Sequence, residues 1–592
     1  MKKRNQIEDK YKWDLTQIYS SDDLLLSDIE KLKRYPEKLS SYKGKLGKPD
    51  KCLEFLKMGS ELGKLSEKIS VYIFLRLSEN LENAKYIELN SVVSTIGKHI
   101  SVASSFEESE LIGYGEEYIK KLMADKRFAE YKMGLNNFLR NKDHILDERE
   151  EIIVSKAMKA LSGYSDVFDN IDNLDLKFAD ALDSKGKKHE VNQHNMTELL
   201  ESKDRVLRCN AQKSITNGYH SMGNTISANY ISSVEGDWFV SDIYKYDSVL
   251  GNELFGENIP KIVYEKLLDN VNSNIKSMHR FYALKKKGLG YKDFYYYDRM
   301  VSICNHKSSM KYSQMCEIVL KALQVLGSDY VDGLKTAMDN RWIDVYPCEK
   351  KESGGFCCNM YEPHPYVLLN TVEDSLSVYT LAHELGHAMH GVLSRKNQPY
   401  ELYDHTIFLA EIASTVNEVL LFKYLYQNAT TKKEKLSHLE KYIGNIIATI
   451  FRQTLYSEFE YFAHTLVEKG EPISKDILNA KYKSLTQKYY GKGVKLIKED
   501  LGEDWMRIPH FYRAFYVYKY ATGMTCAINF ARSIYLGQDG AVERYKKFLS
   551  SGTSDYSINI LKSAGIDLTT DEPYTIMNQE LTWALDEFAK LV

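Results

Sequence analysis

Proline and cysteine are both scarce in this chain. Its 592 residues include only 10 prolines, where average usage would give about 5%. Because proline breaks helices, its scarcity predicts long uninterrupted helices. The 8 cysteines form no CxxC pair of the kind found in zinc or redox sites, so we predict reduced thiols in a cytoplasmic protein. The adjacent Cys357 and Cys358 are candidates for a redox role, although neighbouring side chains of a strand point to opposite faces.

Strong charge of one sign and long apolar runs are also missing. The formal net charge is -3 at pH 7, which gives no basic field of the kind that binds nucleic acid or anionic lipid. No stretch approaches the roughly 18 apolar residues of a membrane span. The start, MKKRNQIEDKYKW, lacks the apolar core of a secretory signal. Nucleic acid and membranes are therefore not expected partners, and the expected location is the cytoplasm.

Helical periodicity is abundant instead. From residue 20 to about residue 164, apolar residues recur at spacings of three and four, which is typical of amphipathic helices. Residues 176–192 alternate around the triplet SKG and predict a small hairpin. We therefore predict a mainly α protein with an N-terminal helical lobe over residues 1–190. A second lobe, residues 191–592, would hold the candidate catalytic residues.

The stretch TLAHELGHAMHG places His383, Glu384 and His387 within two helical turns. Residues four apart on a helix point in directions only about 40° apart, so the two histidines can share one metal ion. Glu384 is one step further round the helix and can lie beside the open position of the ion. Two neutral nitrogen ligands with an adjacent carboxylate are what a zinc-dependent hydrolase needs.

The HExxH pattern is short enough to arise by chance, so a third ligand is needed. The next helical pattern, Asp404 to Tyr426, carries Glu411 and Glu418 seven residues apart on an apolar face. Carboxylates in such a place are costly unless a positive group is paired with them. We predict that the two histidines and Glu411 hold one zinc ion per chain, and that Glu418 hydrogen-bonds a ligand histidine. His390 either supports the site in the same way or is an ordinary core histidine.

Together, HELGHAMH and FLAEIASTVNE resemble the zinc-binding helix pair of the thimet oligopeptidase and oligoendopeptidase F metallopeptidases. The interval of 24 residues from His387 to Glu411 agrees with that family. The stretches YKWDLTQIY, YKYDSVL, PYVLLN, HFYRAFYVYKYATG and LKSAGIDL are similar to the oligoendopeptidase F branch, so the resemblance covers nearly the whole chain. One departure is GGFCCNMYEPH before PYVLLN, where relatives more often have small and hydroxyl residues. This departure bears on substrate preference and leaves the zinc site intact.

The resemblance implies an elongated, two-lobed, mainly helical fold with a deep substrate channel and a small β element beside the HExxH helix. It also implies a zinc-dependent endopeptidase that hydrolyses internal bonds of short unfolded peptides, through a zinc-bound water activated by Glu384. Such a channel would exclude folded proteins. Short peptides are therefore the expected partners, and the oligomeric state is left open.

A tyrosine-rich stretch, Ile508 to Gly523, offers hydrogen-bond donors for the oxyanion of this reaction. By the resemblance, His510 and Tyr518 are assigned to catalysis, and Tyr512 and Tyr516 to substrate binding. An aromatic stripe that merely packs a helix would give the same pattern in a chain with 44 tyrosines.

Tyr366 is a further candidate for substrate binding. It begins a β-prone run, Tyr366 to Leu369, just ahead of the histidine helix, and the stretch Tyr366 to Asn370 is the candidate for contact with a peptide. If this run is an edge strand, it can pair with the backbone of a peptide and fix its register without demanding particular side chains. The alternative is a strand with a purely structural role.

Two other functions are compatible with parts of this pattern. A catalytically silent helical protein could bind peptides without cutting them, but such a protein would not need Glu384. An exopeptidase could use the same zinc chemistry to clip residues from one end of a peptide. The products made from a peptide blocked at both termini distinguish these two functions from an endopeptidase.

Overall fold

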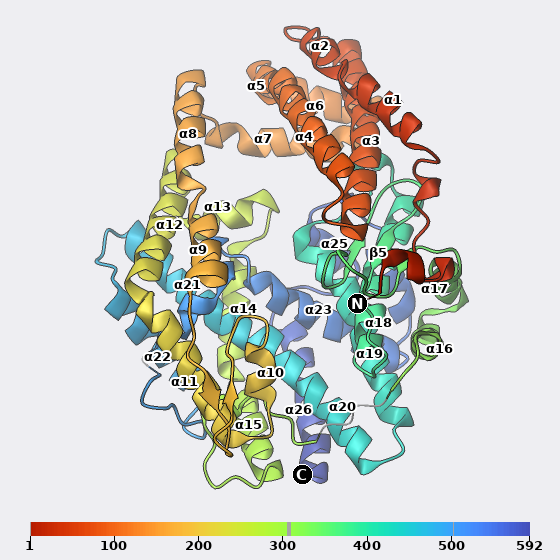
Figure 1. The fold of residues 1–592 in the computed structure, drawn as a ribbon. Helices are drawn as coiled ribbons and strands as arrows, with labels where there is room; N and C mark the ends of the chain where they lie inside the picture. Colours follow the sequence, from red (N-terminus) through yellow and green to blue (C-terminus); the bar gives the residue numbers. More distant parts are fainter. Residues whose placement is uncertain (1, 305–308, 501) are drawn as a thin grey trace. The chain divides into compact units, whose positions relative to one another are not determined.

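The computed structural model describes residues 2–304, 309–500 and 502–592 and consists mainly of helices (Figure 1). The predicted mainly α class is therefore confirmed. The chain divides into two compact units, each assembled from three segments: unit 1 from Met1–Asp143, Lys307–Tyr424 and Phe530–Gly565, and unit 2 from His144–His306, Leu425–Asn529 and Ile566–Val592. This division differs from the predicted lobes 1–190 and 191–592, and a self-contained catalytic lobe stays a prediction.

Unit 1 is built around long amphipathic helices at its beginning. The longest, α3 (Pro49–Glu79), starts with proline at its first position, where no backbone hydrogen bond is lost. Its buried positions include Leu62, Ile69 and Ile73, and they join an apolar core that also takes in Tyr366 of the later sheet. The other helices of this unit are α1 (Asp22–Leu32), α2 (Tyr35–Ser40), α4 (Ala84–Ser104), α5 (Phe106–Gly113), α6 (Glu116–Ala124), α7 (Lys132–Asn141), α16 (Tyr312–Ala322), α17 (Ser328–Asp339), α18 (Ser377–Asn397), α24 (Ala541–Leu549) and α25 (Ser557–Ser563), with short helical turns η1 (Arg4–Gln6), η2 (Asp9–Tyr11), η3 (Leu15–Gln17), η4 (Lys126–Tyr131), η8 (Leu323–Leu326) and η9 (Tyr400–Leu402).

A three-stranded sheet in unit 1 packs against α18. Its order is β3 (Ile343–Asp344), β5 (Tyr366–Leu368) and β4 (Phe356–Cys358), with β3 parallel and β4 antiparallel to β5. The strand predicted at Tyr366 is confirmed, but its predicted edge position is wrong. Both sides of β5 are paired and Tyr366 is fully buried, so the two edges of the sheet are formed by β3 and β4.

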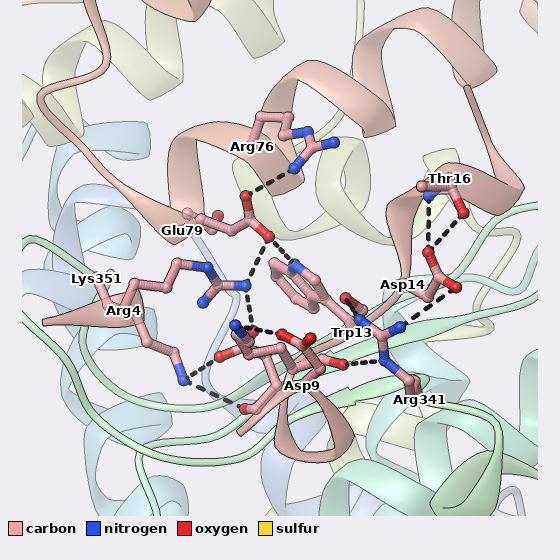
Figure 2. Close-up of polar contacts among 12 residues, drawn as sticks. Arg4, Asp9, Trp13, Asp14, Thr16, Arg76, Glu79, Arg341 and Lys351 are labelled. Carbon is pink, nitrogen blue, oxygen red and sulfur yellow. Dashed lines mark hydrogen bonds and ion pairs between the residues drawn. The ribbon is translucent and has the colours of Figure 1, made fainter. Parts of the chain in front are cut away.

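Figure 2 shows how the segment that precedes α1 is fastened to α3 and to this sheet. Nη2 of Arg4 donates to Glu79 at the end of α3 and to Asp344 in β3, at 2.6 Å in each case. The indole Nε1 of Trp13 also donates to Glu79, at 2.7 Å, and its ring meets that of Tyr366 edge-on. These contacts attach the segment that precedes α1 to both α3 and the sheet.

Unit 2 is also mainly helical. The hairpin predicted in residues 176–192 is confirmed as the antiparallel pair β1 (Ala181–Leu182) and β2 (Lys188–His189). The helices of this unit are α8 (Glu148–Leu161), α9 (Tyr164–Asn170), α10 (Met196–Glu201), α11 (Arg205–Ser221), α12 (Gly223–Ile243), α13 (Val249–Gly256), α14 (Lys261–Ser273), α15 (Lys276–Gly288), α20 (Lys432–Ile446), α21 (Arg452–Glu468), α22 (Lys475–Tyr490) and α26 (Glu572–Leu591), with short segments η6 (Ile171–Asp175), η7 (Tyr296–Asp298), η10 (Ile447–Phe451), η11 (Asp504–Arg507) and η12 (Pro509–Tyr512).

Three elements carry residues of both units: η5 (Lys142–His144), α19 (Ile407–Asn428) and α23 (Tyr518–Tyr535). The candidate metal ligands on α18 and α19 all belong to unit 1, and the tyrosine-rich stretch up to Asn529 belongs to unit 2. Among the helices of the described residues, none combines the length and apolar character that a membrane crossing needs.

Candidate metal centre

Helix α18 carries the HExxH sequence with its two histidines side by side. The ring centroids of His383 and His387 lie 4.9 Å apart, as expected for residues one turn apart. Both side chains are only partly buried, whereas the neighbouring Leu385 is fully buried. The apolar face of the helix therefore packs into unit 1 and leaves the two imidazoles facing a common point.

Helix α19 brings Glu411 to the same point. Its Oε2 lies 3.3 Å from Nε2 of His383 and 3.5 Å from Nε2 of His387. Within the ranges that the structure describes, this is the one group of histidine, cysteine and acidic side chains able to hold a metal ion, with all ligand atoms within 4.8 Å of one another. Ligands about 2.0–2.2 Å from a tetrahedral zinc ion lie about 3.3–3.5 Å apart. The predicted ligand set therefore suits zinc in its chemistry, and the distances from both histidines to Glu411 match this spacing.

Glu418 holds the ring of His383 from the other side. Its Oε1 lies 2.6 Å from Nδ1 of His383, so the proton on Nδ1 is held there and Nε2, which faces Glu411, is the nitrogen that a metal ion would bind. Burial disfavours the charged form of His383, but the contacts with Glu411 and Glu418 outweigh it and raise its pKa to about 10. Burial also disfavours the charge of Glu411, yet its contacts with the two histidines lower its pKa. A metal ion must therefore displace a proton to bind here.

A close contact between the two helices makes this arrangement possible. A Cβ atom on Gly386 would lie 2.5 Å from Cα of Ser414 on α19, so only glycine allows the helices to approach this far. The hydroxyl of Ser414 donates to Oε2 of Glu411 at 3.0 Å, and Nδ2 of Asn417 donates to the carbonyl of Ala382 at 3.0 Å. Sequence reasoning missed these contacts, although a buried asparagine in an apolar helix was a signal for one of them.

Glu384 lies beside this point without contributing a ligand. It is 6% exposed, and burial raises the pKa of its carboxyl. Its Oε1 would be 3.5 Å from a Cβ atom placed on Gly355, which directly precedes β4. The carboxyl group of Glu384 therefore faces the beginning of β4, one of the two edge strands.

His390 does not contact a ligand histidine by any hydrogen bond that the structure shows. It is buried, and its ring stacks on that of His405 with centroids 4.0 Å apart and packs at a tilt against Phe548 at 5.3 Å. Burial lowers its pKa well below the usual value. These contacts favour the second of the two predicted roles, a neutral histidine that packs the core behind His387.

The tyrosine-rich stretch in unit 2 separates into two groups. The rings of His510 and Tyr516 lie parallel with centroids 6.1 Å apart, and the hydroxyl of Tyr520 donates to that of Tyr516 at 3.1 Å. These three side chains are partly exposed. Tyr518 is instead 1% exposed and packs against Tyr264.

Tyr512 also packs against a core residue, Phe168, at 4.9 Å. The structure therefore brings Tyr516 together with His510, adds Tyr520 as a residue not assigned from sequence, and places Tyr512 and Tyr518 in the packing of unit 2. The catalytic and substrate-binding roles of His510 and these tyrosines stay predictions.

Known proteins resemble this chain over both units. Residues 198–580 match the description Peptidase family M3, and residues 110–178 match Oligopeptidase F. Oligopeptidase PepF of Bacillus subtilis is 32% identical over 100% of this chain and 89% of its own length. Group B oligopeptidase PepB of Streptococcus agalactiae is 32% identical over 96% of this chain and 94% of its own length.

A solved structure resembles the fold as well. The crystal structure of oligoendopeptidase-F from Enterococcus faecium has a TM-score of 0.74 and 27% sequence identity. The similarity covers 96% of this chain and 98% of that one. These matches confirm the resemblance that the sequence motifs indicated.

Proposed function

Because this chain belongs to peptidase family M3 and is a metalloendopeptidase, we propose that it uses zinc to hydrolyse internal bonds of short unfolded peptides. The observation that carries this proposal is the convergence of His383, His387 and Glu411 on one point, with Glu384 beside it on the same helix. The names of the relatives, oligopeptidase and oligoendopeptidase, support peptides as the substrate class.

The donor set suits a metal-assisted hydrolysis in which Glu384 moves the proton. A zinc ion held by these ligands would polarise the scissile carbonyl and lower the pKa of a water molecule. Glu384 would accept the proton of the attacking water at its carboxylate and deliver it to the leaving amine. General acid–base catalysis of this kind contributes about 10²–10⁴-fold to the rate. Glu418 keeps His383 oriented, so that the ligand geometry is set before the substrate arrives.

Strand β4 is the better candidate for pairing with the substrate backbone. Its partner β5 has no free edge, whereas β4 ends the sheet and begins beside Glu384. Pairing through main-chain groups would fix the register of a peptide while tolerating many side chains. We also propose that His510 and Tyr516 donate hydrogen bonds to the oxyanion. The family resemblance supports this role for His510, and the partly exposed ring of Tyr516 beside it supports the second donor. Tyr518 is less suited to it because it is buried.

A doubly blocked, internally quenched peptide tests the proposal. The purified protein should cut it internally, a chelator should abolish cleavage, and added zinc should restore it. Glu411→Ala should lose both the metal and the activity, whereas Glu384→Gln should keep one zinc per chain and lose turnover. Metal content by mass spectrometry and product masses are the measurements.

The remaining functions give different results in the same experiment. Products clipped only from unblocked peptides, one or two residues at a time, would identify an exopeptidase. A protein that holds zinc and binds peptides but cuts none of a broad mixture would be a silent peptide binder. Cleavage at an unchanged rate by Glu384→Gln would contradict the proposed base.

A further inference from the structure

The turn that separates His510 from Tyr518 is held in an unusual backbone conformation. At its centre Phe515 has φ of +49°, in the left-handed region, although it is not a glycine. A bulky residue adopts this region only where its surroundings compensate for the steric cost. Phe515 is also 1% exposed. Some feature of unit 2 must therefore hold both its backbone and its ring.

Glu460 on α21 holds the backbone of Phe515. Its Oε1 accepts the N–H of Phe515 at 2.7 Å, across 55 positions of the sequence. The ring of Phe515 packs against His464, one turn further along α21, with centroids 4.9 Å apart, and against Tyr264 at 5.9 Å. Both parts of Phe515 are thus attached to neighbouring positions on one helix.

The surroundings of Glu460 keep its carboxyl neutral. Burial raises its pKa to about 8, against the opposing effects of His464 and of the Phe515 amide. Nδ1 of His464 lies 2.9 Å from the main-chain oxygen of Glu460, and Nε2 lies 3.1 Å from Oδ2 of Asp237, so the imidazole already has two partners. The other oxygen of Glu460, Oε2, has no hydrogen-bond partner among the described residues. The interaction that Glu460 offers the turn is therefore a single accepted hydrogen bond.

The aromatic rings on either side of the turn depend on its direction. His510 precedes Phe515 and Tyr516 follows it directly, yet their rings lie parallel at 6.1 Å. The guanidinium of Arg513 lies over the ring of Tyr516 at 4.1 Å. A different φ at Phe515 would swing Tyr516 away from both residues, because the chain leaves the turn in another direction.

We propose that Glu460 is a positioning residue for peptide hydrolysis, which fixes the left-handed turn at Phe515 and thereby the relative placement of His510 and Tyr516. This inference rests on the proposed function only for its effect on turnover, since the hydrogen bond itself can be tested without substrate. Glu460 touches neither the substrate nor the metal ligands in this role.

Three variants of α21 separate positioning from general stability. Glu460→Gln keeps an uncharged acceptor of the same shape, whereas Glu460→Leu removes the acceptor and keeps the volume. Thr454→Val changes another buried polar side chain of α21, whose hydroxyl donates to the carbonyl oxygen of Ile450 in the preceding η10. Each purified holoenzyme is assayed for zinc content, kcat and KM with the quenched peptide, and hydrogen exchange of peptides that contain residue 515.

In Glu460→Leu the backbone amide of residue 515 should exchange its hydrogen faster than in the wild type. The kcat should fall at least about tenfold and KM should change less, because displacement of catalytic groups lowers turnover more than substrate binding. Its zinc content should stay at one per chain. Glu460→Gln should restore slow exchange and a kcat within about threefold of the wild type, and Thr454→Val should show neither defect. In a protein that already carries His510→Ala, adding Glu460→Leu should lower kcat little further, since both changes remove the contribution of His510 to turnover.

A folded Glu460→Leu protein with unchanged exchange at residue 515, or with unchanged kcat, overturns the inference. So does a Glu460→Gln protein as impaired as Glu460→Leu. If Glu460→Leu does not fold, Glu460→Asp replaces it, because its side chain is one methylene shorter and its carboxyl lies further from the amide of Phe515. The same results for exchange and kcat are then expected of Glu460→Asp. If the wild type cuts no peptide, the proposed function fails, and the exchange data alone decide whether Glu460 holds the turn.

Discussion

Each unit contains a group of histidines and carboxylates on neighbouring helical turns, and the two groups differ in what their polar atoms face. In unit 1, His383, His387 and Glu411 direct one atom each to a common point, and the Glu411 side chain is 42% exposed. In unit 2, Glu460 and His464 are each 1% exposed, and their hydrogen bonds go to the main chain and to Asp237. The same residue types therefore form a candidate metal site where their polar atoms converge and stay partly exposed. Where their polar atoms are buried and hydrogen-bonded to other parts of the protein, they hold a turn.

The two groups also differ in the pKa values of their carboxyl groups. In unit 1 the contacts between opposite charges lower the pKa of Glu411 and raise that of His383, and a divalent ion can take the place of the proton. In unit 2 burial raises the pKa of Glu460, so the neutral acid is the stable form. At Glu411 the contacts with two histidines outweigh burial, whereas at Glu460 burial outweighs the effect of His464.

The same substitution in both groups tests the comparison most strongly. Glu384→Gln should lower kcat by about 10²–10⁴-fold, because the proton acceptor is lost, while zinc content stays unchanged. Glu460→Gln should leave kcat within about threefold, because an amide replaces a neutral acid of the same shape. Steady-state kinetics and metal analysis of the two proteins, side by side, provide the measurement. Equal losses in both would show that the distinction between the groups is wrong.

The second prediction concerns pH and unit 2. A carboxyl whose pKa is raised on folding stabilises the protein fully below its unfolded pKa, about 4.3, and this stability is lost as pH rises through the folded pKa. For Glu460 the folded pKa is about 8, and the raised pKa of His464 acts in the same direction. Between pH 5 and 8 the free energy of unfolding of the wild type should therefore fall by several kcal/mol more than that of Glu460→Gln. The reason is that a tenfold change in a proton-binding constant corresponds to about 1.4 kcal/mol.

Urea denaturation of both proteins at pH 5, 6.5 and 8 measures this difference. Contributions from the metal site are common to the two proteins and cancel when their free energies of unfolding are subtracted. A difference that does not vary with pH would mean that Glu460 is already ionised in the folded protein.

The third prediction concerns the helix contact that aligns the unit 1 group. Gly386→Ala places a methyl group 2.5 Å from Cα of Ser414 and 2.8 Å from the carbonyl oxygen of Ala413. Because both are main-chain atoms, α19 must shift, at a cost of about 1–3 kcal/mol, and Glu411 moves with it. Thermal unfolding and zinc affinity should both fall.

Gly444→Ala in α20 is the matched control, since no atom lies within 4 Å of the added methyl group. It should stabilise the protein by about 0.5–1 kcal/mol, because alanine loses less conformational entropy than glycine in a helix. A Gly386→Ala protein as stable as this control would contradict the close contact between α18 and α19.

The smallest effect is expected at Glu418. Glu418→Gln removes the negative charge opposite Nδ1 of His383 but retains a hydrogen-bonding group, and it should weaken zinc binding by about 10–100-fold. Glu67→Gln, at a carboxylate that pairs with Tyr403, should leave zinc affinity unchanged. Competition with a chromogenic chelator measures both, and equal affinity in Glu418→Gln and the wild type would assign Glu418 to packing alone.

The unit 1 group could be predicted from sequence because local geometry determines most of it. The spacing of His383 and His387 places both on one face of any helix, and Glu411 stood out as a carboxylate in an apolar helix. The fold class followed from the scarcity of helix breakers. The family resemblance, with its interval of 24 residues from His387 to Glu411, then supported the pairing of the two helices.

The contacts that sequence reasoning missed are those made between distant residues. The edge position of β5 was predicted wrongly because its second partner, β3, is only two residues long and has no periodicity to detect. Burial of Tyr518 depends on Tyr264, and the turn at Phe515 depends on Glu460. A left-handed phenylalanine has no signature in the sequence, because the residue that compensates for it lies 55 positions away.

The division of each unit into three segments has a consequence for how the chain is made. Arg4 must pair with Asp344, which is 340 positions later, so at about 5–20 residues per second it leaves the ribosome roughly 20–70 s before its partner. The helix that bears His383 packs against α24, which ends at Leu549. The nascent chain therefore cannot complete unit 1, which holds the candidate metal ligands, until the segment Phe530–Gly565 has been made.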